Sequence, residues 1–181
     1  MAGKRTLIGW TAGLLLVATA GFAAAGNAGL LPDVRTRIAD TAGIRGFDVD
    51  CTYNALSGGL AVAYPAWNGA PARVYTRPWI CTAVNRAYRR SWRGADRTGK
   101  TAYALLVLTH EAIHLSGYPG ARDERLTECE ALRLLPAVAR RLGAPEQMVP
   151  TLEMWAGQAH AKLVREYPSY GGGCEDSGAG R

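Results

Sequence analysis

The chain has 181 residues, of which 48% are hydrophobic and 20% are charged. This is enough apolar material for one modest domain with a buried core, and it excludes a disordered chain, a collagen-like repeat and a coiled-coil array. The formal net charge of +6 at pH 7 is too small to indicate a specific nucleic-acid partner.

Residues 1–25 have the pattern of an export signal. Lys4 and Arg5 precede an uncharged run that extends to Ala25, and the small residues at its end offer a cleavage site. The run is also long enough to be a signal anchor that crosses a membrane once. In both cases we expect residues 26–181 to form a single extracytoplasmic domain, either secreted or held at the membrane only by the N-terminal segment.

Export would place the four cysteines in a compartment where disulfides form. They are Cys51, Cys81, Cys129 and Cys174. An even number in an oxidising compartment, with no C-x-x-C pair, predicts two disulfides rather than a zinc knuckle or a redox dithiol. Three pairings are possible, and buried free thiols are the alternative. We favour the pairs Cys51–Cys81 and Cys129–Cys174, because each would close one half of the chain.

The first half of this domain has a mixed helical and extended pattern. We expect a short helix over 34–41 with Asp33 as its N-cap, and a second helix over 78–92 that opens at Pro78. Aromatic and β-branched residues predict strands over 47–53, 60–64 and 72–76, and Asn68-Gly69 predicts a hairpin between the last two.

The end of the second predicted helix is strongly basic. Its arginines are Arg86, Arg89, Arg90 and Arg93. Such a run is typical of a solvated face, and it could also contact an anionic polymer of the cell envelope.

The second half of the domain predicts helices over 98–115, 124–135 and 150–166. The first of them is apolar nearly all round at Leu105, Leu106 and Leu108, as expected for a helix inside a core. We therefore expect an α+β fold, with a small sheet packed beside a predominantly helical domain.

The predicted core helix ends in Thr109-His110-Glu111-Ala112-Ile113-His114, an H-E-x-x-H pattern. Residues four apart share one helix face, so His110 and His114 can present two imidazole nitrogens to one Zn²⁺. Glu111 leans to the side of such a site, where it could take a proton from a metal-bound water without being a ligand. The alternative is that the two histidines and the glutamate are satisfied structurally at a helix end.

Two carboxylates on the next predicted helix are expected to face the predicted metal site. Asp123 is the expected N-cap of this helix, and Glu124 and Glu128 lie one turn apart on one face. Folding the two helices as a hairpin about residues 119–120 makes Glu124 and Glu128 straddle the predicted metal.

With these residues the chain resembles the zincin metallopeptidases, and among them the gluzincin branch. In that branch the third ligand is a Glu on a following helix, often with a second carboxylate four residues later that hydrogen-bonds a ligating histidine. The resemblance implies a zincin-like domain in which His110, His114 and Glu124 hold Zn²⁺ and Glu128 supports a histidine. The alternative is that Glu128 is the ligand and Glu124 supports a histidine.

The metzincin branch continues the motif as H-E-x-x-H-x-x-G-x-x-H, and this chain has Gly117 at the glycine position but Gly120 at the third histidine. The runs Asp123–Cys129 and Tyr170–Cys174 also resemble a group of secreted, zincin-like proteins of actinobacteria, a resemblance that implies no substrate. Candidates for stabilising an oxyanion are Tyr103, Tyr118, Tyr170 and His160.

These patterns together predict a zinc-dependent hydrolase outside the cytoplasm. We expect a peptidase that acts on a peptide or protein substrate, with Glu111 as general base. The alternative is a non-catalytic cell-envelope protein in which a structural metal site and the disulfides stabilise the fold.

Overall fold

A computed structural model describes residues 29–53, 59–93 and 99–167, together with Tyr170 and Cys174. Within these residues the elements run, in order, α1 (Pro32–Ala42), β1 (Asp48–Asp50), β2 (Ala61–Tyr64), β3 (Arg73–Thr76), α2 (Pro78–Arg89), α3 (Lys100–His114), α4 (Glu124–Arg141), a 3₁₀ turn η1 (Glu146–Met148) and α5 (Val149–Glu166). The fold is α+β, as the sequence predicts.

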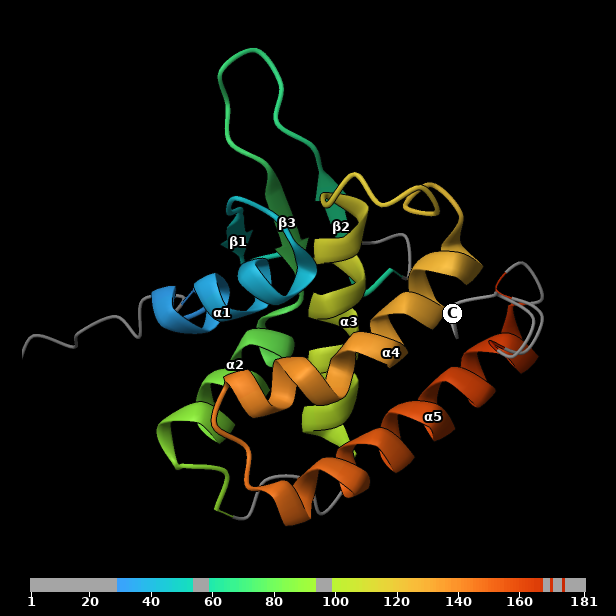
Figure 1. Ribbon diagram of the computed structural model, residues 1–181. Coiled ribbons are helices and arrows are strands. Elements are labelled where there is room, and N and C mark those ends of the chain that lie inside the picture. Colours follow the sequence, from blue (N-terminus) through green and yellow to red (C-terminus); the bar gives the residue numbers. More distant parts are fainter. Residues whose placement is uncertain (1–28, 54–58, 94–98, 168–169, 171–173, 175–181) are drawn as a thin grey trace, which may run out of the picture.

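The three strands form one mixed sheet in the order β1-β3-β2, with β1 parallel and β2 antiparallel to β3. The expected hairpin joins β2 and β3, and it projects from the body of the molecule (Figure 1). Asn68 and Gly69 both have positive φ, 47° and 82°, which suits the twist of a tight two-residue turn. Because β3 lies between the other two strands, β2 lies at an edge of the sheet.

Strand β1 is three residues long, whereas the sequence predicts a strand over 47–53. The carboxylate of Asp50 accepts a hydrogen bond from the backbone N–H of Thr52 at 2.8 Å, and this local turn ends the strand. The expectation of a longer strand was wrong because this side chain offers the backbone a closer partner than the neighbouring strand does.

Helix α2 also stops earlier than expected, at Arg89 rather than Trp92. Ser91 and Trp92 have φ of 47° and 64°, which turns the chain out of the helix. The Trp92 ring is buried, and its Nε1 donates to the backbone carbonyl of Leu142 at 3.1 Å. A tertiary contact therefore decides where α2 ends.

Smaller differences concern helix ends, whereas the basic face is exposed as expected. Helix α1 starts at Pro32, with Leu31 as N-cap, so Asp33 lies in the first turn instead of capping it. Helix α4 continues through Pro136 to Arg141. The side chains of the basic face are all exposed: Arg86, Arg89, Arg90 and Arg93.

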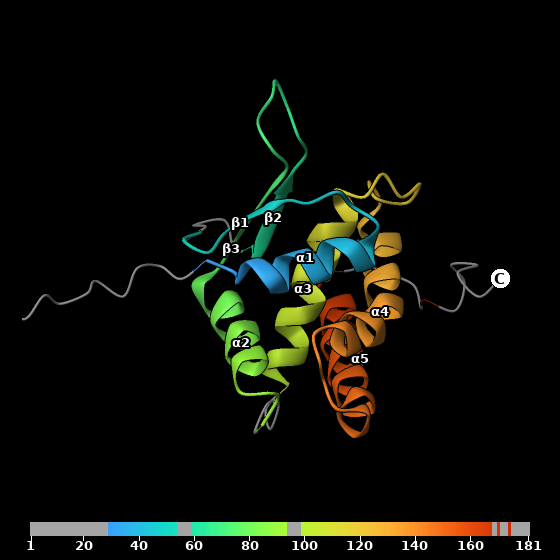
Figure 2. The same ribbon diagram turned by 60° about the vertical axis from the view of Figure 1, so that its left-hand side comes forward.

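Helix α3 runs through the centre of the molecule and packs against α1, α2, α4, α5 and β2 (Figure 2). Leu105, Leu106 and Leu108 are each at most 1% exposed, in agreement with the all-round apolar pattern. The H-E-x-x-H residues occupy the C-terminal end of this helix, so the fold holds them on the element that packs against the most others.

Both favoured disulfides are present. Cys51 pairs with Cys81 and Cys129 pairs with Cys174, with Cα–Cα distances of 6.2 and 5.2 Å. Two disulfides are compatible with an extracytoplasmic protein. The predicted signal or anchor over residues 1–25 lies outside the described residues, and no helix among those that are described is long and apolar enough to cross a membrane.

Candidate metal centre

The site forms where the end of α3 meets the start of α4. The chain reverses over 115–123, and Asp123 caps α4 as expected, its side chain accepting from the backbone N–H of Leu126 at 2.9 Å. The turn needs a glycine at Gly120, because a Cβ there would lie 2.7 Å from the Tyr118 ring and 2.8 Å from Leu126. This close turn brings the first residues of α4 against the histidines of α3.

The two histidines and Glu124 converge on one point. The Nε2 atoms of His110 and His114 lie 2.9 Å apart. The Glu124 carboxylate lies 3.0 Å from Nε2 of His110 and 3.5 Å from Nε2 of His114. These three residues form a group that could hold a metal ion, with ligand atoms all within 4.8 Å of one another.

The opposite nitrogen of each imidazole faces an acceptor. His110 Nδ1 donates to Glu128 Oε2 at 2.8 Å, and His114 Nδ1 donates to the backbone carbonyl of Ala121 at 2.5 Å. These hydrogen bonds fix both rings and both tautomers. In the neutral imidazoles, each Nε2 then carries a lone pair directed into the site.

The donor set fits a cation. Two lone pairs at 2.9 Å repel each other unless a proton or a metal ion lies between them. A tetrahedral zinc site with bonds of about 2.0–2.1 Å places neighbouring ligand atoms roughly 3.3 Å apart. The Nε2–Nε2 separation of 2.9 Å, the 3.0 Å from Glu124 Oε2 to His110 and the 3.5 Å from Glu124 Oε1 to His114 lie on either side of that value.

A proton competes for the same position. Burial disfavours the charged form of His110, but its hydrogen bonds to Glu124 and Glu128 outweigh this effect and raise the pKa of His110 from 6.5 to about 10. The same contacts hold the pKa of the Glu124 carboxyl well below its usual range. The site is therefore built to stabilise positive charge.

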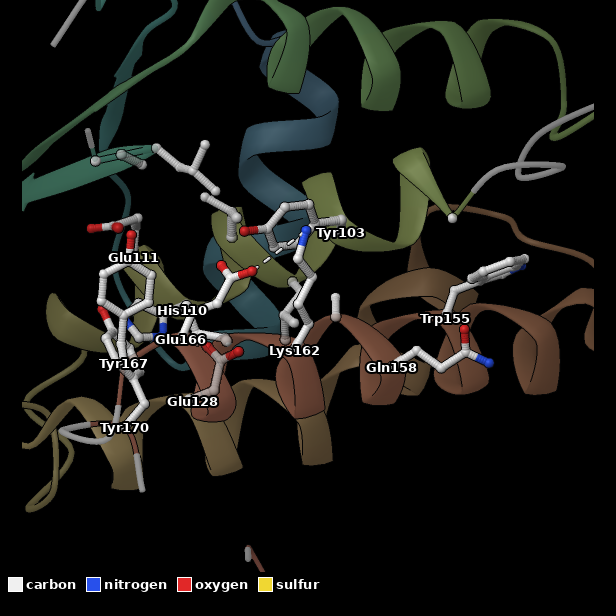
Figure 3. A pocket seen from close by; sticks show the side chains of 18 of the residues that line it. Tyr103, His110, Glu111, Glu128, Trp155, Gln158, Lys162, Glu166, Tyr167 and Tyr170 are labelled. Carbon is white, nitrogen blue, oxygen red and sulfur yellow. Dashed lines mark hydrogen bonds and ion pairs between the residues drawn. The ribbon is translucent and has the colours of Figure 1, made fainter. Parts of the chain in front are cut away.

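A cleft with a volume of about 890 Å³ runs along α3, between the β2 edge of the sheet and α5 (Figure 3). His110, Glu111 and Glu128 line it at one end, and Trp155 lies at the other. Glu111 is 7% exposed and lies outside the three-residue group. Burial raises the pKa of Glu111, and the charges of His110 and His114 oppose this only in part.

The other candidates from the sequence have different places. Tyr103 and Tyr170 line the cleft, whereas Tyr118 packs against the turn at Gly120. His160 lies behind Glu128, with its Nδ1 3.7 Å from Glu128 Oε1. Residue types did not indicate the contact of His114 with the backbone carbonyl of Ala121, since any residue supplies a carbonyl.

Comparisons with protein-family models, with curated proteins and with solved structures found no match to this chain. The case for a function therefore rests on the geometry and chemistry of the residues described above.

Proposed function

We propose that the protein is a zinc-dependent peptidase with a zincin-like domain that acts outside the cytoplasm. The observation that carries the proposal is the convergence of His110, His114 and Glu124 at one end of a cleft that Glu111 also lines. The zincin-like assignment is further supported by an H-E-x-x-H helix that packs against a sheet with β2 at its edge.

Zinc is the metal that suits this donor set best. Two imidazoles and one carboxylate, each imidazole supported by a hydrogen bond on its far nitrogen, are typical of catalytic zinc sites. When bound in such a site, zinc lowers the pKa of a coordinated water to about 7 and polarises a carbonyl oxygen.

Glu111 is the residue proposed to move the proton. It follows His110 in the chain and faces the cleft, yet it does not belong to the group that could hold the metal. Its burial raises its pKa, which brings the carboxylate closer to the basicity that proton transfer near neutral pH requires. Glu111 would accept a proton from the attacking water and pass it to the leaving amine.

The edge strand beside the cleft favours a peptide in an extended conformation. Leu60 and Ala61, at the edge of the sheet, form part of the cleft wall, and Leu106 and Val107 on α3 add apolar surface. An edge strand offers unpaired backbone groups that an extended chain can pair with.

A purely structural metal site is the competing explanation. Structural zinc sites are closed by four protein ligands, whereas catalytic sites use three and leave one position open. The group found among the described residues has three members, and the Glu124 side chain is 47% exposed. This solvent-facing side favours an open position.

The test is hydrolysis of a broad peptide library by the zinc-loaded protein, compared with Glu111→Gln. Glutamine keeps the size of the side chain and cannot accept the proton, so we expect the variant to retain zinc and lose activity by about 10²–10⁴-fold. Glu153→Gln removes the same charge from an exposed position on α5 and should leave activity unchanged. A wild type that binds zinc and cleaves nothing, or a Glu111→Gln variant with full activity, would contradict the proposal.

A further inference from the structure

One face of α3 lines the cleft. Its side chains there recur at intervals of three or four residues, which places them along one face of the helix: Lys100, Tyr103, Val107 and Glu111. At a rise of 1.5 Å per residue, Lys100 and Glu111 are about 16 Å apart along the helix axis. An extended peptide advances about 3.3 Å per residue, so about five of its residues cover this distance.

The start of α3 lies at the end of the cleft far from the metal centre. Gly99, just before this helix, has a φ of 70° and packs so closely on the Trp155 ring that a Cβ would lie 2.9 Å from it. Trp155 and His110 lie at opposite ends of the cleft (Figure 3). Lys100 is therefore part of the remote end, beside Trp155.

Lys100 brings a positive charge to this remote end. Its Nζ lies 5.5 Å from the centroid of the Trp79 ring, a contact that does not use the N–H donors of the ammonium. Within the described part of the chain Lys100 forms no ion pair, and the first turn of α3 contains no acidic residue. The positive end of the helix dipole adds to the charge. This end of the cleft is therefore suited to an anion.

The other lysine of the cleft has a partner. The chain has three lysines among its 21 basic residues, and both that follow Lys4 line the cleft. Lys162 lies on α5 between the two ends of the cleft, and its Nζ is 3.7 Å from Glu166 Oε1 (Figure 3). These two charges offset each other, so the charge available to an anion is that of Lys100.

We propose that the cleft binds peptides with a carboxylate about five residues from the scissile bond, and that Lys100 pairs with this carboxylate. The inference rests on the proposed peptidase function and names the substrate class of that site. A lysine ammonium and a carboxylate form a charge-assisted hydrogen bond. The carboxylate can belong to an Asp or Glu side chain or to the C-terminus of the peptide, and free and amidated C-termini separate these two sources.

The experiment measures kcat/KM for fluorogenic peptides with the zinc-loaded, full exported chain. In one series a single Glu moves through the six positions on each side of a randomised centre, and each peptide is compared with its Gln counterpart. A second series without Glu compares free and amidated C-termini. We expect a preference of roughly 2–5-fold for a carboxylate about five residues from the cleaved bond, the range of an exposed ion pair. It should act through KM and weaken at high salt.

Three variants test the role of Lys100. Lys100→Gln should lose the preference for a carboxylate, and Lys100→Arg should keep it. Lys100→Glu should reverse it, so that Lys is favoured over Glu at the same peptide position. A residue with a purely structural role would not reverse the preference in this way. Arg165→Gln removes one positive charge from an exposed position of α5 outside the cleft, and it should leave the preference unchanged.

Cleavage without any preference for a carboxylate, or a preference that persists in Lys100→Gln, would overturn this inference and leave the peptidase function standing. If the wild type cleaves no peptide, the proposed function fails, and fluorescence anisotropy of the same labelled peptides with the zinc-loaded chain decides about the cleft. Tighter binding of the carboxylate peptide that Lys100→Gln abolishes would support the assignment of Lys100. Equal binding of both peptides, or no binding, would overturn it as well.

Discussion

Glu124→Ala and Glu128→Ala should damage the protein in different ways, because one carboxylate is half exposed and the other is buried. The Glu124 side chain is 47% exposed and faces the Nε2 atoms of both histidines. The Glu128 side chain is 6% exposed and accepts the hydrogen bond from His110 Nδ1. We assign Glu124 as a ligand and Glu128 as the support of a ligand.

The expected magnitudes follow from these environments. Glu124→Ala removes one of three proposed ligands, so we expect a loss of zinc affinity above the roughly 10–100-fold typical of supporting residues, which is our expectation for Glu128→Ala. For the metal-free protein the order reverses. Exposed ion pairs contribute about 0–1 kcal/mol, whereas a buried donor left without a partner costs about 1–3 kcal/mol. Glu128→Ala should therefore lower the Tm of the metal-free protein by about 2–12 °C, and Glu124→Ala should lower it much less.

The assay pairs a zinc-competition titration with thermal unfolding in the presence of a chelator. Glu128→Gln is the conservative control, since its amide oxygen can still accept from His110 Nδ1 and should recover most of the lost stability. If Glu128→Ala weakens zinc binding more than Glu124→Ala does, the two roles are exchanged. If neither variant weakens binding, the third ligand lies elsewhere and our assignment is wrong.

Three further outcomes are expected. Zinc affinity should rise about tenfold per pH unit between pH 7 and 9, because the raised pKa of His110, about 10, keeps a proton on the metal-free site that zinc must displace; affinity independent of pH in a buffered competition titration would refute this. Intact-mass analysis without reductant should show four hydrogens fewer than the reduced chain, two for each disulfide, and peptide mapping should recover the pairs Cys51–Cys81 and Cys129–Cys174; four free thiols would contradict the fold. Cys51→Ala/Cys81→Ala, which opens a loop with a sequence separation of 30, should lower the free energy of unfolding by about 3–4 kcal/mol in a urea titration; a loss below about 1 kcal/mol would show that the bridge constrains the unfolded chain little.

Local patterns predicted the parts of this structure that depend on neighbouring residues. The all-round apolar centre of α3 identified the core helix, and the i, i+4 spacing of His110 and His114 placed them on one face. The ends of β1 and α2 were not predicted, because a turn at Asp50 and the burial of Trp92 against Leu142 determine them. Such contacts compete with strand or helix propensity, and the periodic pattern of hydrophobic residues in the sequence does not reveal them.

Long-range contacts limited the prediction of the site in a similar way. Spacing brought Glu124 and Glu128 to the histidines, but it did not indicate which carboxylate would face Nε2 and which Nδ1. In the structure Glu124 faces Nε2 of His110 and Glu128 faces its Nδ1, because the close turn at Gly120 brings the start of α4 against α3. Tyr170 lies beside His110, with ring centroids 6.5 Å apart, although the two residues are far apart in the chain, and residue spacing carries no information over such a distance.

The metal content of the purified protein tests the central claim most directly. Wild-type chain prepared without chelators should carry close to one zinc per chain by elemental analysis, and His110→Ala and His114→Ala should each lose it while keeping both disulfides. Glu153→Ala, an exposed change on α5, should keep the zinc. A folded wild-type protein that remains metal-free after incubation with Zn²⁺ would contradict the account.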